Sequence, residues 1–194
     1  MLALDGKLVY LQFKIHNKWM KCREISGVLF NRRLSLKQRG VLYRTCIRTV
    51  MTYGCETWSM KKENEDFLTR AERRMIRMLC GVKLSDREES EVLQKRLGLI
   101  DDIATVTRKA RLRWFGHVYR REPEEGIKKA FSIKVEGKTD RGRPRKTWYE
   151  VIKNDLREIR ATEEDTLDRV KWRSIVRSVT ANPRSRGKRQ YNLE

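Results

Sequence analysis

The stretch Asp101-Asp-Ile-Ala-Thr-Val-Thr-Arg-Lys-Ala-Arg-Leu-Arg-Trp-Phe-Gly-His-Val-Tyr-Arg-Arg121 decides the fold class of this chain. Apolar residues recur in it at three- and four-residue intervals, and either Asp101 or Asp102 can cap its first turn. The spacing predicts a helix with an apolar stripe of Ile103, Val106, Ala110, Trp114 and Val118. Basic residues lie beside that stripe, and we expect them to form a nucleic-acid-binding patch: Arg108, Lys109, Arg111, Arg113, Arg120 and Arg121.

Helical periodicity extends over most of the chain. It predicts helices near residues 9–29, 35–58, 62–80 and 85–97. Ser35 is a natural N-cap, Ser85 forms a capping-box pattern with Glu88, and Gly81 and Gly98 are natural terminators. Two further short helices, around residues 148–159 and 162–179, form a predicted hairpin. Because this hairpin buries little area alone, we expect it to dock on a third element or on nucleic acid.

The composition changes between residues 122 and 147, where two prolines and three glycines indicate a linker. A short apolar run, Ala130–Val135, leaves room there for one strand. We therefore predict a mainly α protein: a helical bundle over residues 1–121, a basic linker over 122–147 and a helical module over 148–180. Residues 181–194 are basic, lack apolar periodicity and are predicted to be a disordered tail.

The charge of the chain points to a polyanionic partner. It has 46 Lys and Arg against 26 Asp and Glu, a formal net charge of +20. Binding of positive charges to phosphates releases counterions, which makes binding to a polyanion favourable. In the free protein the same excess of positive charge mainly causes self-repulsion. Ribosomal, DNA-binding and retroelement proteins fit this balance, and an ordinary metabolic enzyme fits poorly. A hydrophobic fraction of 39% still suffices for a packed core.

The densest basic run lies in the predicted linker and supplies the strongest candidate contacts: Arg141, Gly142, Arg143, Pro144, Arg145 and Lys146. Glycine allows a close approach of the backbone, proline keeps the segment extended, and guanidinium groups bind phosphate. Arg-Gly-Arg-Pro is also the core of the AT-hook, which enters narrow minor grooves. Two interpretations stay open, minor-groove insertion or a helix that starts at Pro144 after solvated arginines.

No catalytic residue, cofactor site or metal site is predicted. Asp101-Asp102 precedes a helix rather than lying in a strand hairpin, so capping explains it better than metal binding. His16 and His117 complete no zinc spacing with the cysteines. We interpret Trp58, Trp114, Trp148 and Trp172 as core residues rather than base-stacking residues, since each lies at or beside an apolar helical position.

The cysteines and the hydropathy bear on the cellular setting. None of the cysteines forms a Cys-x-x-Cys pair, which favours reduced core residues in an intracellular protein; they are Cys22, Cys46, Cys55 and Cys80. No apolar run approaches the roughly 20 residues that span a bilayer, so we expect no membrane partner. We expect a nuclear or cytoplasmic ribonucleoprotein setting, with DNA, RNA or both as partners.

Several ordered blocks resemble the region after the polymerase core of non-LTR retrotransposon reverse transcriptases of the RTE type. They span residues 27–179 and are Gly27-Val-Leu-Phe-Asn-Arg-Arg-Leu-Ser-Leu-Lys37, Val41-Leu-Tyr-Arg-Thr45, Met51-Thr-Tyr-Gly-Cys-Glu-Thr-Trp58, Ala71-Glu-Arg-Arg-Met-Ile-Arg-Met-Leu79, Ala110-Arg-Leu-Arg-Trp-Phe-Gly-His117, Arg141-Gly-Arg-Pro-Arg-Lys-Thr-Trp148 and Thr162-Glu-Glu-Asp-Thr-Leu-Asp-Arg-Val-Lys-Trp-Arg173.

The resemblance implies a thumb-like helical region and a carboxy-terminal module that touch template, primer or target DNA beside an upstream polymerase palm. That family's catalytic aspartates and endonuclease lie further upstream, so the resemblance implies a fragment without enzymatic activity. Two alternatives stay open: an inert retroelement fragment without a selected function, and a ribosome-associated or RNA-packaging basic protein. The sequence does not decide the oligomeric state.

Overall fold

The structure is a computed structural model that describes residues 20, 23–31, 33–133 and 146–180. These residues are mainly helical, which confirms the predicted fold class, and no β-strand occurs among them. The α-helices are α2 (Ser26–Leu29), α3 (Leu36–Leu42), α4 (Thr49–Thr52), α5 (Lys62–Cys80), α6 (Ser90–Arg96), α7 (Ile103–Tyr119), α8 (Gly126–Ser132), α9 (Trp148–Ile159) and α10 (Arg169–Ser178). A π-helix and short 3-10 helices join them: η1 (Tyr43–Arg48), η2 (Cys55–Thr57), η3 (Leu84–Asp86) and η4 (Glu164–Thr166).

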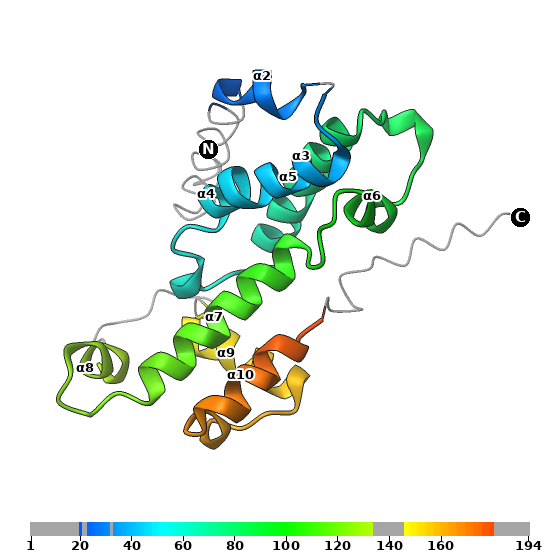
Figure 1. Cartoon of the computed structure of the whole chain (residues 1–194). Coiled ribbons are helices and arrows are strands. Elements are labelled where there is room, and N and C mark those ends of the chain that lie inside the picture. The colour runs from blue at the N-terminus through cyan, green and yellow to red at the C-terminus, as the bar shows by residue number, and fades with distance from the viewer. Residues whose placement is uncertain (1–19, 21–22, 32, 134–145, 181–194) are drawn as a thin grey trace, which may run out of the picture.

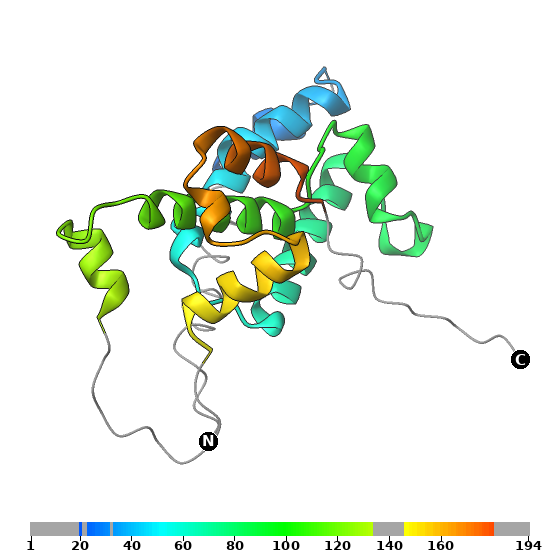
Figure 2. The same ribbon diagram turned by 90° about the horizontal axis from the view of Figure 1, so that it is seen from below.

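Helix α7 runs through the middle of the molecule. Figure 1 shows α3, α4 and α5 toward its amino-terminal half and α9 and α10 beside its carboxy-terminal half. In the turned view, α9 and α10 flank α7, and both helices contact it (Figure 2). Helix α7, which carries four of the predicted basic site residues, is therefore the helix that joins the two halves of the fold.

Local capping signals account for several helix ends. Ser35 and Gln38 form a capping box at the start of α3, and the Asp102 carboxylate accepts the backbone N–H of Thr105 at the start of α7. Gly81 ends α5 with a left-handed φ of 69°, a conformation that glycine adopts without strain. These caps confirm the predictions for Ser35, Asp102 and Gly81.

Two predicted helix starts are wrong. Ser85 does not cap a helix, because Asp86 accepts the backbone N–H of Lys83 and closes η3, and α6 begins at Ser90. Thr162 and Asp165 likewise close a turn that leads into η4. Helix α10 begins only after Asp168, whose carboxylate accepts two backbone N–H groups. In both places a hydrogen bond from a backbone N–H to an aspartate side chain stabilises a turn and a short 3-10 helix instead of the start of an α-helix.

The predicted linker is partly helical. Ala130, Phe131 and Ser132 lie in α8, so the strand proposed for Ala130–Val135 is wrong over these residues. Phe131 packs edge-on against Trp148 and Tyr149, and this aromatic contact holds α8 against α9. Residues 134–145 lie outside the described residues, as do the tail at 181–194 and most of the first predicted helix; α2 covers only its carboxy-terminal end.

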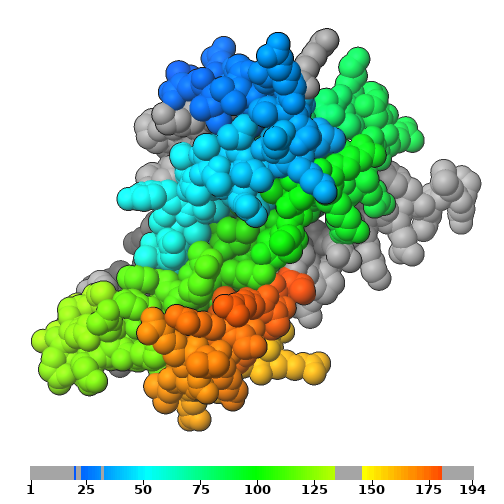
Figure 3. Space-filling model, viewed as in Figure 1, coloured from blue at the N-terminus to red at the C-terminus, as the bar shows by residue number. Residues whose placement is uncertain are grey.

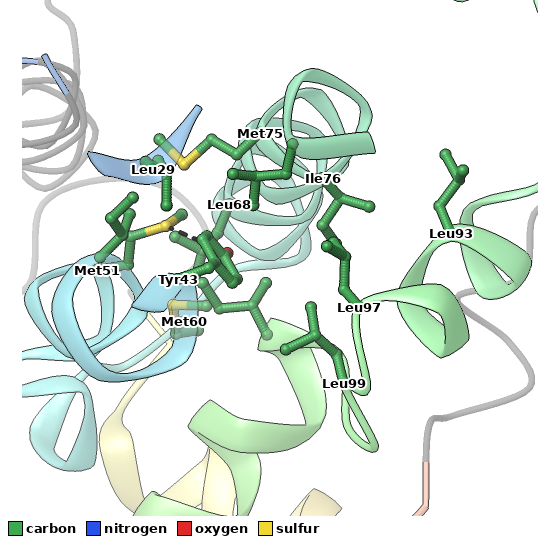
Figure 4. Close-up of a cluster of buried hydrophobic side chains, with 13 residues drawn as sticks. Leu29, Tyr43, Met51, Met60, Leu68, Met75, Ile76, Leu93, Leu97 and Leu99 are labelled. Atoms are coloured by element: carbon green, nitrogen blue, oxygen red, sulfur yellow. Dashed lines mark hydrogen bonds between the residues drawn. The ribbon is translucent and has the colours of Figure 1, made fainter. Parts of the chain in front are cut away.

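The first hydrophobic core lies among η1, α4, α5, α6 and the start of α7. Figure 4 shows side chains from these elements meeting in one cluster. Its buried members are Leu29, Tyr43, Ile47, Met51, Met60, Leu68, Met75, Ile76, Leu79, Leu93, Leu97, Leu99 and Ile103. Glu72 is buried beside it and accepts hydrogen bonds from the Tyr43 hydroxyl at 3.0 Å, Arg48 Nη2 at 2.6 Å and the Ile103 amide at 2.7 Å. Burial raises the pKa of Glu72, and the Arg48 charge opposes that shift.

The second hydrophobic core joins α7, α9 and α10. Its buried members are Leu112, Phe115, Ile152, Leu156, Trp172, Val176 and Val179. The Trp172 indole donates to the Leu112 carbonyl at 3.2 Å, and the Trp148 indole donates to the Glu56 carbonyl at 2.7 Å. The carboxy-terminal helices therefore dock on a third element, as predicted. That element is α7, which contributes to both cores, so its carboxy-terminal half does not belong to the first bundle alone.

The cysteines differ in exposure, and the three that the structure describes are free thiols. Cys55 is buried, and burial raises its pKa to about 11. Cys46 is exposed, so its prediction as a core residue is wrong. Cys22 lies outside the described residues. None of the helices in the described part of the chain contains an apolar stretch of membrane-spanning length.

Candidate nucleic-acid interface

The basic residues of α7 divide between two environments. Arg108 and Arg111 are buried, with 9% and 6% of their surface exposed. Arg113 and Arg121 are exposed, and Arg120 is half-buried. The predicted single patch on this helix is therefore two sets of arginines with different surroundings.

Arg108 and Arg111 meet a carboxylate of α9. Arg111 Nη2 lies 2.7 Å from Asp155 Oδ2, and Arg108 Nε lies 3.3 Å from Asp155 Oδ1. Arg108 Nη2 also donates to the Asp155 carbonyl at 3.2 Å and lies 2.8 Å from Glu158 Oε2. Burial raises the pKa of Asp155, while the two guanidinium charges oppose that shift. These two arginines hold α9 against α7, and their prediction as nucleic-acid contacts is corrected.

The apolar stripe predicted for α7 is only partly buried. Ile103 and Val118 lie in the interior, whereas Val106, Ala110 and Trp114 are half-buried. The sequence pattern failed here because α7 packs against several elements, which together bury a wider part of the helix. The arginines on the buried side are tolerated because α9 supplies an internal carboxylate.

We call Arg113, Trp114, His117, Arg120 and Arg121 the open face of α7. Arg113, Trp114 and His117 share a face because they lie three and four residues apart in α7, and Arg120, the C-cap, and Arg121 follow its last turn. In the space-filling view, α7 reaches the surface between residues near 50 and α10 (Figure 3). Lys109 adjoins the strip, but its Nζ pairs with Asp101 at 2.8 Å.

The charges of the open face are compensated to different degrees. Arg121 Nη1 lies 3.1 Å from Glu125 Oε2, in an exposed i, i+4 pair. Arg113 is exposed, and its Nε donates to the Lys109 carbonyl at 3.2 Å, an uncharged acceptor. Arg120 Nη1 donates to the Thr166 carbonyl at 2.6 Å, which places its guanidinium beside the start of α10.

Two arginines of α10 lie close enough to act electrostatically on Arg120, and we call Arg120, Arg169 and Arg173 the arginine corner. The pKa of Arg120 is lowered by burial, then by the positive charges of Arg169 and Arg173. Beyond the effect of burial, Arg169 and Arg173 add a positive field at the Arg120 guanidinium. Clustered guanidinium groups with such a field bind phosphate oxygens well.

The α10 arginines of this corner are not among the predicted site residues, although their spacing in the sequence could have indicated them. Arg169, Arg173 and Arg177 recur every four residues, and all three are exposed on α10. With a rise of about 1.5 Å per residue, their Cα atoms repeat about every 6 Å along one edge. The neighbouring Lys171 is already paired, its Nζ lying 2.6 Å from Asp165 Oδ1.

The predicted linker contacts lie mostly outside the described residues. Arg141, Gly142, Arg143, Pro144 and Arg145 belong to the undescribed range 134–145, so no contact is assigned to them. Lys146 is exposed and immediately precedes the capping box of Thr147 and Glu150, and α9 begins at Trp148. Pro144 is therefore not the first residue of α9.

Lys146 lines a groove of about 1020 Å³ among α5, α7, α9 and the end of α10. Its other cations include Lys62 and Arg157, and its carboxylates include Glu65, Asp66 and Glu158. Burial raises the pKa of Glu65, a shift that Arg111 opposes. Because both signs of charge line this groove, it lacks the positive excess that distinguishes the arginine corner.

The tryptophans also divide by environment. Trp172 and Trp148 belong to the second core, and Trp58 packs against the first, as predicted. Trp114 belongs to neither cluster. Its indole stacks on the His117 imidazole, with centroids 5.3 Å apart and planes 27° from parallel.

The described residues contain no group of three acidic, histidine or cysteine side chains arranged to hold a metal ion. Asp101 pairs with Lys109 and Asp102 caps α7, which accounts for the acidic pair. In comparisons with protein-family models, curated proteins and solved structures, no family, protein or structure matches the chain.

Proposed function

We propose that the chain binds nucleic acid through its phosphates, with the arginine corner as the principal contact. The observation that supports this most is the convergence of Arg120 with Arg169 and Arg173: burial lowers the pKa of Arg120, and the two neighbouring positive charges lower it further. A phosphate diester placed there relieves this repulsion and accepts charge-assisted hydrogen bonds. The net charge of +20 adds long-range attraction to any polyanion.

The second part of the proposal concerns origin. We infer from the ordered sequence blocks that the chain is a carboxy-terminal fragment of an RTE-type RNA-directed DNA polymerase. In that setting it grips template-primer or target DNA inside the cell, while the upstream palm and endonuclease perform the chemistry. The chain by itself is not an enzyme in this proposal, and Arg141–Lys146 remains a predicted additional contact.

The test is the salt dependence of binding to a 20-base-pair duplex and to single strands. The variant Arg169→Gln/Arg173→Gln removes two charges from the corner, and Arg70→Gln/Arg73→Gln removes two exposed charges from α5 as a matched control. Each phosphate contact contributes about 0.9 to the slope of log K against log salt on B-DNA. We expect the corner variant to flatten the duplex slope by about 1.8 and the control to leave it nearly unchanged.

Equal slopes for the wild type and both variants would overturn the corner as the contact. Binding that occurs only at very low salt and does not depend on either pair of arginines would favour an inert basic fragment. A strong preference for structured RNA over both DNA forms would favour the RNA-packaging alternative.

A further inference from the structure

We infer that Trp114, supported by His117, stacks on an unpaired base, so that the interface prefers single-stranded over fully paired nucleic acid. This rests on the proposed function, because the arginines must first hold the phosphates. The occupant is a single strand, DNA or RNA, with its bases free to stack.

The position of Trp114 is the first reason. The indoles of Trp148 and Trp172 donate to the backbone carbonyls of Glu56 and Leu112, and both rings pack in the second core. Trp114 belongs to neither core cluster; it is half-buried, and its ring stacks on His117 of the same helix. A large aromatic ring on a charged surface is a platform for a base.

The orientation of the ring is the second reason. His117 lies one turn away and stacks on the indole, and Arg121 Nη2 lies 3.3 Å from His117 Nε2. Arg121 is held in turn by Glu125 at 3.1 Å. This chain of contacts holds the aromatic pair in place before any ligand arrives, which lowers the entropy cost of stacking.

Charge complementarity is the third reason. Arg113 directly precedes Trp114, and Arg121 Nη2 lies 3.3 Å from His117 Nε2, so an exposed guanidinium group lies next to each member of the aromatic pair. Arg113 and Arg121 therefore flank the aromatic pair, and a strand whose phosphates they bind has its bases near the indole. In a perfect duplex both faces of each internal base are covered by its neighbours, whereas an unpaired base has a free face for Trp114.

The experiment compares oligonucleotides of equal length that differ in their bases or in their sugars. The probes are a 12-nucleotide deoxythymidine strand, the matching uridine strand and a 12-nucleotide strand with abasic sites throughout, which keeps every phosphate. Stacking contributes enough per base that we expect wild-type protein to bind the thymidine strand at least about fivefold more tightly than the abasic strand.

The variants locate this preference. Trp114→Ala should bring the two affinities together, whereas Trp114→Tyr, which retains a ring, should keep most of the difference. Tyr53→Ala, which removes an aromatic side chain that is 76% exposed outside the open face, should change neither affinity. Circular dichroism of each variant verifies the fold, and the wild-type comparison of the two strands decides the question even if one variant is unstable.

The outcomes separate this inference from the proposed function. Equal wild-type binding to thymidine and abasic strands, with a steep salt slope, overturns the stacking inference and leaves the phosphate grip standing. Loss of binding to all strands at moderate salt overturns both. Preference for the thymidine or the uridine strand distinguishes a DNA from an RNA occupant.

Discussion

Asp155 allows two neighbouring arginines to be buried instead of exposed. It is 8% exposed and compensates the charges of Arg108 and Arg111 across the α7–α9 contact. Without this carboxylate, the unfavourable desolvation free energy of the two buried guanidinium groups would be poorly compensated by charge pairing. The residue therefore turns two apparent surface cations into part of the interior.

We predict that Asp155→Asn destabilises the fold by about 3 kcal/mol or more, because removing one partner of a buried pair leaves uncompensated charge. The measurement is the free energy of unfolding from urea titration. Glu125→Gln is the control, since it removes only the exposed i, i+4 pair with Arg121 and is expected to change stability little. Similar small effects of both substitutions would contradict a structural role for the Asp155 pair.

At the scale of elements, the contact between α7 and α10 depends on a small residue. A Cβ atom added at Gly116 would overlap the Trp172 indole, whose nitrogen donates to the Leu112 carbonyl. Gly116 thus lets α10 approach α7 closely enough to bring Arg169 and Arg173 beside Arg120.

We predict that Gly116→Ala destabilises the protein by about 1–3 kcal/mol, the usual cost of overpacking a filled interior. It should also weaken nucleic-acid binding, because displacement of α10 separates the arginine corner. Gly126→Ala in α8 is the matched control, since an added Cβ there meets nothing within 4 Å, and we expect it to be neutral or slightly stabilising. Thermal unfolding and the salt series measure the two effects, and equal behaviour of both alanine variants would argue against the close-approach explanation.

At the scale of the whole molecule, α7 couples two hydrophobic cores. Ile103 lies in the first cluster, and Leu112 and Phe115 lie in the second. A helix shared by both cores cannot unfold in one of them without exposing apolar surface in the other. We therefore expect one cooperative transition for the described helices.

We predict that Leu68→Ala, at a fully buried site of the first core, lowers the unfolding free energy by about 2–5 kcal/mol. Hydrogen exchange under native conditions measures this loss of unfolding free energy at individual backbone amides. The most protected amides of α9 and α10 should lose as much protection as those of α5, because α7 transmits the change. Unchanged protection in α9 and α10 would show that the second core is stable independently.

Much of the fold was predictable because its signals are local. The bounds of α5, the caps at Ser35 and Asp102 and the stop at Gly81 follow from residues a few positions apart. The starts of α6 and α10 were mispredicted because the Lys83–Asp86 and Thr162–Asp165 bonds compete locally with helix formation. Less of the candidate site was predictable: Arg113, Arg120 and Arg121 remain on the open face, while Arg169 and Arg173 join the site only through the packing of α10.

The sequence by itself determined the helical class, the principal helix ends and the strong positive charge, because periodicity, capping and composition act over short distances or over the whole chain at once. The tertiary structure alone decided which arginines are free. Asp155, which lies 44 residues after Arg111, holds one set inside, and α10 brings Arg169 and Arg173 to Arg120. Whether a charge is buried depends on which distant element covers it, and no local spacing contains that information.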